Sequence, residues 1–130
     1  MGSPSARPPD GSSTILVAED DTPMRASIEI WLADTGWDVI TVENGQAAVE
    51  HLSPEIDVLV CDRRMPVLNA SGVLDHLDDV DLDIPVIVLT AYEPDEDVSE
   101  DDVAAYLTKP VGKEVITSVI RRVLSARASN

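Results

Sequence analysis

The chain has 130 residues, of which 44% are hydrophobic, and it contains one cysteine. Its 25 acidic and 9 basic side chains give a net charge of −16. A chain of this length forms one domain that folds without disulfides or a structural metal. The single cysteine excludes an internal disulfide, and the charge disfavours direct binding to nucleic acid or to an anionic membrane. We therefore expect a cytoplasmic protein that binds neither.

The acidic excess also bears on the environment of the protein. Acidic surfaces with few lysines stay hydrated where salt screens their self-repulsion, which favours a halophilic origin. An acidic mesophilic protein can have the same composition, so composition alone leaves both origins open. Residues 1–13, rich in Pro, Gly and Ser, are expected to form a disordered tail. The domain is expected to cover 14–127, and 128–130 a short C-terminal end without an output domain.

Strand and helix patterns alternate from residue 14 onward. Short apolar runs rich in branched residues predict strands, and apolar residues three and four apart predict helices. The first helix is predicted to have Thr22 as its N-cap and Pro23 at its first helical position. The predicted strands are 14–18, 37–42, 56–61, 85–90 and 105–108, and the predicted helices are 22–35, 45–52, 71–77 and 112–127.

This alternation predicts an α/β fold with a parallel sheet. Five strands joined by right-handed crossovers fit a flavodoxin-like, doubly wound five-stranded parallel sheet in the order 2-1-3-4-5, with helices on both faces. In such sheets, ligand sites form beyond the carboxyl ends of the strands. The residues that directly follow or end four of the strands are therefore the candidates for a functional site.

Those candidates are acidic, with one hydroxyl and one of only two lysines. They are Glu19, Asp20 and Asp21 after the first strand, Asp62 after the third, Thr90 at the end of the fourth, and Lys109 after the fifth. Clustered carboxylates repel one another unless a cation is present, and hard oxygen ligands suit Mg²⁺, with Mn²⁺ as the alternative ion. A carboxylate beside a metal, a lysine and a hydroxyl is typical of phosphoryl transfer. Solvated acidic turns are the simpler reading of any one carboxylate, but the shared placement at strand ends favours a site.

At this point the sequence resembles the receiver domain of two-component response regulators over about residues 14–127. The segments that carry the resemblance are ILVAEDD at 15–21, DVLVCDRRMP at 57–66, VIVLTA at 86–91 and AYLTKP at 105–110. The DRRMP and YLTKPV segments, with the acidic composition, are similar to haloarchaeal response regulators of the HalX type. Together, in this order, the segments are more specific than any one of them.

The resemblance implies a phosphoryl-transfer site. Asp62 is implied as the phosphoacceptor, and Glu19 and Asp20 as the acidic pair that binds Mg²⁺ together with Asp62. The backbone carbonyl of Arg64 is implied as a further metal ligand. Asp21 lies one position beyond the pair. The implied partner is a histidine kinase or a phosphotransfer protein, whose phosphohistidine is attacked by Asp62.

The resemblance also implies a conformational switch. Thr90 is implied to bond a phosphate oxygen, Lys109 to pair with the phosphate, and Tyr106 to turn inward when Thr90 moves. The Lys109–Pro110 bond is implied to be cis. The switch is expected to alter homodimerisation or partner binding at a face made by the fourth helix, the strand 105–108 and the last helix.

Two side chains are expected to set the lifetime of the phosphoryl group. They are Arg64, two residues past the phosphoacceptor, and Tyr92, two residues past Thr90; both are large and are expected to hinder the attacking water. The segment 91–104 carries seven acidic residues and few apolar ones, so its helix is expected to be short, shifted or partly disordered. Arg63 is expected to be solvated, and Cys61 to be a buried core residue rather than a redox group.

Other functional classes fit the sequence less well. One is a phosphorylation-independent interaction module on the same fold, which the retained acidic, hydroxyl and lysine residues argue against. Another is an aspartate-nucleophile phosphatase of the haloacid-dehalogenase type, which needs an acid where this chain has Arg64. A dinucleotide-binding fold is disfavoured because EDDTP follows the first strand in place of a glycine-rich turn. We therefore expect a signalling receiver that catalyses only its own phosphorylation and dephosphorylation.

Overall fold

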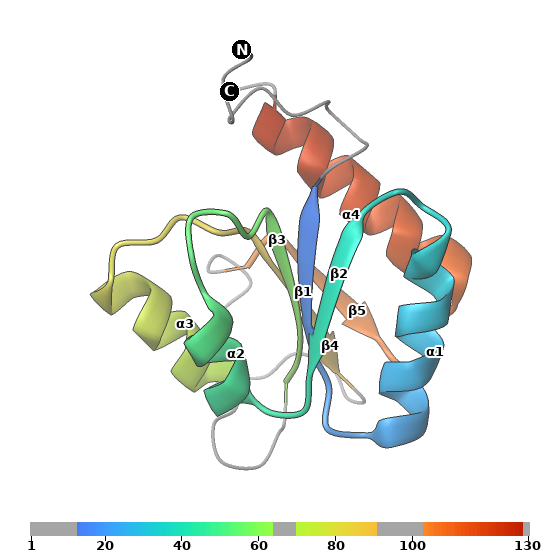
Figure 1. Ribbon diagram of the computed structural model, residues 1–130, viewed down its shortest axis with the longest axis horizontal. Coiled ribbons are helices and arrows are strands. Elements are labelled where there is room, and N and C mark those ends of the chain that lie inside the picture. The colour runs from blue at the N-terminus through green and yellow to red at the C-terminus, as the bar shows by residue number, and fades with distance from the viewer. Residues whose placement is uncertain (1–12, 64–69, 91–102, 129–130) are drawn as a thin grey trace.

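The computed structural model describes residues 13–63, 70–90 and 103–128. The alternation of strands and helices predicted from the sequence is confirmed, with boundaries that differ by two residues or fewer (Figure 1). The elements in chain order are β1 (Thr14–Ala18), α1 (Thr22–Ala33), β2 (Asp38–Val42), α2 (Gly45–His51), β3 (Val58–Asp62), α3 (Ala70–Asp79), β4 (Val86–Thr90), β5 (Ala105–Thr108) and α4 (Lys113–Ala128).

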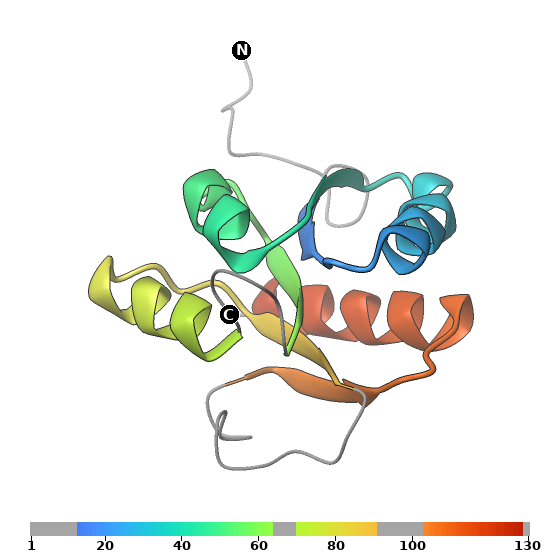
Figure 2. The ribbon, with the colours of Figure 1, turned by 90° about the horizontal axis from the view of Figure 1, so that it is seen from below.

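The five strands form one parallel sheet in the order β2-β1-β3-β4-β5, as the sequence predicted. Helices α1 and α4 pack together on one face, and α2 and α3 pack together on the other (Figures 1 and 2). In the strand register, Ala18 lies opposite Cys61, Asp62 opposite Leu89, and Thr90 opposite Thr108. The carboxyl ends of β1, β3, β4 and β5 therefore meet at one edge of the sheet.

The core is divided by the sheet into two layers. Alternate residues of β1 face opposite sides, so Ile15 and Val17 pack in the layer of α1 and α4, and Leu16 and Ala18 pack in the layer of α2 and α3. Strands β3 and β4 are buried along their whole length. Such continuous burial is typical of central strands in a sheet covered on both faces. Within the described ranges, no helix combines the length and apolarity needed to cross a bilayer.

The start of α1 differs from the prediction by one residue. Asp21, not Thr22, is the N-cap, because its Oδ2 accepts a hydrogen bond from the backbone N–H of Met24 at 3.0 Å. A carboxylate at this position satisfies a free helix N–H and interacts favourably with the helix dipole. Thr22 is therefore the first helical residue, and the side chain of Asp21 is engaged in capping.

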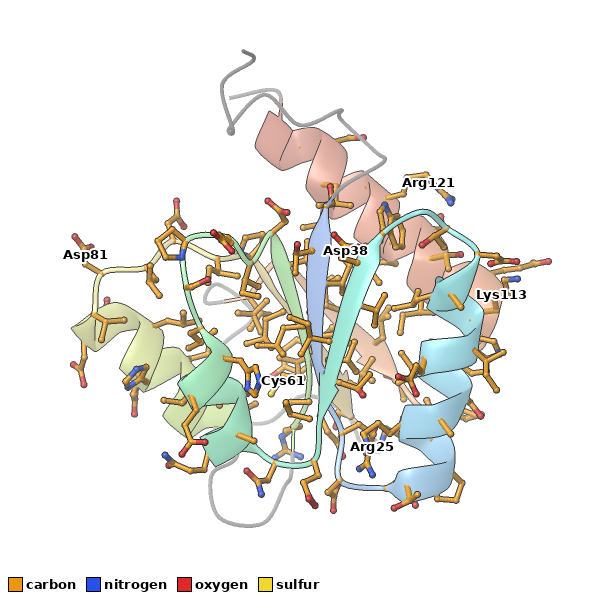
Figure 3. All side chains as sticks on the ribbon, in the orientation of Figure 1. Arg25, Asp38, Cys61, Asp81, Lys113 and Arg121 are labelled. Atoms are coloured by element: carbon orange, nitrogen blue, oxygen red, sulfur yellow. The ribbon has the colours of Figure 1, made fainter. Side chains whose placement is uncertain are left out.

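The aromatic side chain that begins the β2 region closes one edge of the core. Trp37 is 7% exposed, and the guanidinium of Arg121 from α4 lies 5.6 Å from the centroid of its ring. Figure 3 shows Arg121 near the amino end of β2. The contact combines a cation–π interaction with packing of the arginine side chain on the indole.

The packing of α4 on the sheet gives a test of this fold. Ile120 is fully buried, whereas Val115 on the same helix is 50% exposed. Replacing Ile120→Ala should lower the free energy of unfolding by about 2–4 kcal/mol, because it removes buried methyl groups and leaves a cavity. The control Val115→Ala should change it by about 0.5 kcal/mol or less. Urea unfolding of both variants in the same buffer measures the difference, and equal effects would contradict the described packing.

Candidate functional site

Three carboxylates converge at the edge of the sheet where β1 and β3 end. Glu19 and Asp20 follow β1, and Asp62 is the last residue of β3; one oxygen from each lies within 4.8 Å of the other two. Glu19 is fully buried, Asp62 is 8% exposed, and Asp20 is exposed to solvent. The cluster therefore has a buried wall and an open side. Asp21, which the sequence also placed at this edge, is not part of it.

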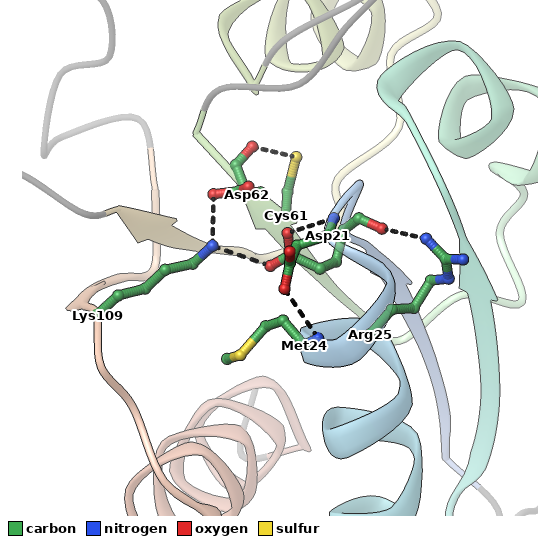
Figure 4. A network of polar contacts seen from close by, with 7 residues as sticks. Asp21, Met24, Arg25, Cys61, Asp62 and Lys109 are labelled. Carbon is green, nitrogen blue, oxygen red and sulfur yellow. Dashed lines mark hydrogen bonds and ion pairs between the residues drawn. The ribbon is translucent and has the colours of Figure 1, made fainter.

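One lysine bridges the two buried carboxylates. Lys109 Nζ donates to Glu19 Oε1 at 3.1 Å and lies 3.3 Å from Asp62 Oδ1 (Figure 4). The backbone N–H of Lys109 donates to the carbonyl of Thr90 at 2.7 Å, and the Lys109–Pro110 peptide bond is cis. The ends of β4 and β5 thus hold the ammonium group over the acidic cluster.

The carboxylates carry more charge than one ammonium balances. Burial and the neighbouring charge of Glu19 raise the pKa of Asp62 to about 7, and Lys109 offsets only part of this rise. Burial lowers the pKa of Lys109, but the hydrogen bond to Glu19 and the charges of both carboxylates together raise it above its usual value. A further cation would relieve the remaining repulsion.

The donor set fits a hard divalent cation. Carboxylate oxygens are the ligands that Mg²⁺ and Mn²⁺ prefer, and few of them are needed because Mg²⁺ keeps several waters. The exposed side of the cluster, formed by Asp20, leaves room for those waters. The backbone carbonyl of Arg64, predicted as a further ligand, lies outside the described residues.

The two residues expected to switch lie on neighbouring strands. Thr90 is 1% exposed and ends β4 at the same edge as the acidic cluster. Tyr106 lies in β5 opposite Val88 and packs, half-buried, against the core layer of α2 and α3. Tyr92, expected to tune dephosphorylation, lies outside the described residues.

The surroundings of Cys61, which precedes the candidate phosphoacceptor, make its thiol unreactive. Cys61 is fully buried, and burial, with the charges of Asp62 and Glu19, raises the pKa of its thiol far above the usual range. The thiol donates only a weak hydrogen bond to the Asp62 carbonyl at 3.4 Å. A thiol that stays protonated is a poor nucleophile and metal ligand, so Cys61 is a core residue as the sequence indicated.

The sequence-based predictions failed for two arginines: the burial of one was wrong, and the role of the other was not predicted. Arg63 was expected to be solvated but is 3% exposed; its backbone joins Leu89 of β4 and Ala70 of α3. Arg25 drew no prediction, although its Nη1 donates to the carbonyl of Glu19 at 2.8 Å. One signal was present: Arg25 is the only lysine or arginine between positions 8 and 62, and it stands near a helix start, where a positive charge is unfavourable.

The fold and this pocket define a class of protein: a flavodoxin-like α/β domain with an acidic pocket and a lysine at the carboxyl edge of its sheet. The family model for the response regulator receiver domain matches residues 15–121. A putative transcriptional regulator of Haloferax volcanii is 34% identical over 110 residues, which cover 85% of this chain and 19% of that protein. The transcriptional regulatory protein PrrA of Mycobacterium tuberculosis is 33% identical over 125 residues, 91% of this chain and 52% of that protein.

Solved structures agree with these sequence matches. The receiver domain of the Francisella response regulator 1452 superposes with a TM-score of 0.78 at 26% identity, covering 88% of this chain and 98% of that one. The chain therefore belongs to the response regulator receiver domain family, and its role is in two-component signalling. Receiver domains interact with histidine kinases or phosphotransfer proteins. The chain spans 19% to 52% of the length of the curated relatives described above.

The raised pKa of Asp62 predicts a pH-dependent stability in metal-free protein. Because the folded-state pKa of about 7 exceeds the ordinary value of 3.8, the stabilisation from a protonated Asp62 is complete below about pH 4 and is lost as the pH rises through 7. The side chain that Asp62→Asn introduces cannot ionise, so the variant's free energy of unfolding does not fall in this way as the pH rises. Its advantage over wild type in free energy of unfolding should grow by on the order of 1–2 kcal/mol between about pH 5 and about pH 8.

Urea unfolding at both pH values, with a chelator present, measures this change. The matched control is Asp75→Asn, which removes one carboxylate from an exposed position on α3. Its difference from wild type should stay nearly constant with pH. Lys109 adds no pH dependence to the free energy of unfolding between these two pH values, because its raised pKa makes it titrate above this range. An Asp62→Asn advantage that shrinks as the pH rises would contradict the described electrostatics.

Proposed function

We propose that Asp62 is the phosphoacceptor of a Mg²⁺-dependent receiver, and that a partner histidine kinase or phosphotransfer protein supplies the phosphoryl group. The observation that carries this proposal is the position of the Asp62 carboxylate, 3.3 Å from the Lys109 ammonium inside a cluster of three carboxylates. Membership of the receiver family supports it. Asp62 is the one acid of the cluster that both contacts Lys109 and ends a central strand.

The transfer uses groups that the pocket already holds. An oxygen of ionised Asp62 attacks the phosphorus of a phosphohistidine; the O–P bond forms as the N–P bond breaks, and the imidazole nitrogen keeps the electron pair and takes up a proton. Lys109 balances charge on the transferred group. Glu19, Asp20 and Asp62, with the carbonyl of Arg64, would hold Mg²⁺. When bound, Mg²⁺ would add its two positive charges to that of Lys109 and so help to offset the negative charge of the transferred group.

Phosphorylation would then shift the domain between two conformations. Thr90 would bond a phosphoryl oxygen, and Tyr106 would turn further into the space beside it. The output face would comprise β5, α4 and the helix expected within 91–104, of which residues 91–102 lie outside the described part of the chain. Homodimerisation or binding of an output partner at this face would follow.

Two broader features support a setting for this activity. The net charge of −16 and the relative from Haloferax volcanii favour a protein that works in high salt, close to the HalX-type regulators. We expect the protein to act in the cytoplasm. We also expect this segment not to bind nucleic acid or membrane directly.

Phosphorylation from a small donor tests the proposal. Incubation with acetyl phosphate and Mg²⁺ in high salt should add one phosphoryl group, about 80 Da, to wild type. Asp62→Asn should gain none, because it lacks the attacking oxygen, and a chelator should abolish the gain in wild type. Intact mass spectrometry measures the product.

The control for this experiment is Asp75→Asn, which should be labelled as wild type is. Lys109→Met should be labelled on the order of 100-fold more slowly, since it removes one charge-balancing group. A folded wild type that gains no mass and binds no Mg²⁺ would overturn the proposal in favour of a phosphorylation-independent binding module.

The lifetime of the phosphoryl group gives a separate test. We expect the large side chains of Arg64 and Tyr92 to hinder the water that hydrolyses the mixed anhydride. Replacing both with Ala should shorten the phosphoryl half-life about tenfold or more, a barrier change of about 1.4 kcal/mol. Decay of the phosphorylated mass after removal of acetyl phosphate measures it. An unchanged half-life would show that these two side chains do not control dephosphorylation, and it would not affect the proposal that Asp62 is phosphorylated.

A further inference from the structure

The backbone of Glu19 is held on both sides of its Cα atom, and its carbonyl is part of the peptide that joins it to Asp20. The backbone N–H of Glu19 donates to the carbonyl of Val42, at the end of β2, at 3.0 Å. The carbonyl of Glu19 accepts from Nη1 of Arg25, on α1, at 2.8 Å. The turn between β1 and α1 is thus fixed to a strand at one end and to a helix side chain at the other.

The side chain of Glu19 is fixed as well. Its Oε1 accepts from Lys109 Nζ at 3.1 Å, and its Oε2 accepts from the backbone N–H of Asp21 at 3.1 Å. Asp21 in turn caps α1 through Met24 (Figure 4). The position of Glu19 therefore depends on several independent contacts, and the loss of one would leave the others in place.

Asp20 differs, because its side chain is exposed and no hydrogen bond or ion pair joins it to any residue that the structure describes. Its carboxylate nevertheless lies within the cluster with Glu19 and Asp62. The direction of this side chain is therefore set by the backbone just before it. The Glu19 carbonyl belongs to that same peptide unit, and Arg25 is the side chain that holds it.

The surroundings of Arg25 argue that this contact is its main one. Among the described residues it forms no ion pair with a carboxylate, although 25 acidic residues are present in the chain. It borders a hollow of about 300 Å³ that Thr41, Glu43 and Ala47 also line. Figure 3 shows Arg25 between α1 and the carboxyl ends of β1 and β2. Its charge near the start of α1 also opposes the helix dipole.

We propose that Arg25 is a positioning residue for divalent-cation binding. By holding the Glu19 carbonyl, it keeps Asp20 directed at Asp62 before the cation arrives. This inference rests on the proposed Mg²⁺ site and adds to it a residue that touches neither the cation nor the phosphoryl group. Residues that orient a ligand in this way commonly change metal affinity by about tenfold or more.

Position and charge predict opposite effects for this residue. If Arg25 acted only as a nearby positive charge, its removal would strengthen the binding of a cation. If it acts by position, its removal weakens that binding, because Asp20 then samples directions away from the cluster. The sign of the change in Mg²⁺ affinity therefore separates the two roles.

The experiment measures Mg²⁺ affinity by titration calorimetry on wild type and on Arg25→Met, which keeps an unbranched apolar stem and removes the guanidinium donors and the charge. We expect about tenfold weaker binding, with part of the loss recovered in Arg25→Lys. If Arg25→Met does not fold, Arg25→Gln carries the same test. The matched control is Arg122→Met, which removes one charge from an exposed position on α4 and should leave the affinity unchanged.

Two further readouts separate positioning from general destabilisation. Asp20→Ala should weaken Mg²⁺ binding, and adding Arg25→Met to it should cause little further loss, since both changes remove the same interaction. In labelling with acetyl phosphate, the Mg²⁺ concentration for half-maximal rate should rise about tenfold while the rate at saturating Mg²⁺ changes about twofold or less.

Affinity that is unchanged or tighter in Arg25→Met, or effects of Arg25→Met and Asp20→Ala that add fully, would overturn the inference. Those results would leave the proposed function standing, because wild type would still bind Mg²⁺ and accept the phosphoryl group. A wild type that binds no Mg²⁺ would instead overturn the proposed function and this inference with it.

Discussion

The contact on which this domain most depends is the bridge from one ammonium group to two buried carboxylates. Lys109 reaches both Glu19 and Asp62, which come from strands that are neighbours in the sheet. Without the lysine, two negative charges would share a buried site, which is among the most unfavourable arrangements in a protein interior. The bridge also joins β5, at the edge of the sheet, to its centre. The attachment of the outer strand β5 and the chemistry of the pocket therefore depend on the same atoms.

This arrangement leaves the pocket incompletely neutralised, and that imbalance is useful. A pocket with full charge balance would have little affinity for a divalent cation, whereas this one has a carboxylate with a pKa near 7 and another open to solvent. The repulsion that destabilises the metal-free domain is the same repulsion that favours cation binding. Cation binding, as proposed, would thus be coupled to folding through one small group of side chains.

Much of this was readable from the sequence, because it followed from strand order. Once the alternating pattern gave a parallel sheet, the residues after each strand had to meet at one edge, and Glu19, Asp20, Asp62 and Lys109 do so. The contact of Arg25 with a backbone carbonyl was not readable, because no residue pattern encodes which carbonyl a side chain meets. The predicted N-cap of α1, Thr22, was wrong by one residue, because Asp and Thr are both good N-caps and the neighbouring residues did not distinguish them. Arg63 was misjudged because arginines are usually exposed, and here the turn after β3 carries it into the interior.

The hydrogen bond from the Lys109 N–H to the Thr90 carbonyl has a mechanical consequence. It crosses between β4 and β5 at 2.7 Å and is the last backbone rung before both strands leave the sheet. It therefore connects Thr90 to Lys109, the residue that follows β5, and Tyr106 lies three residues earlier in the chain. In the proposed switch, movement at the pocket would reach Tyr106 through this short segment of backbone. Such a route would require no chain of repacked side chains across the core.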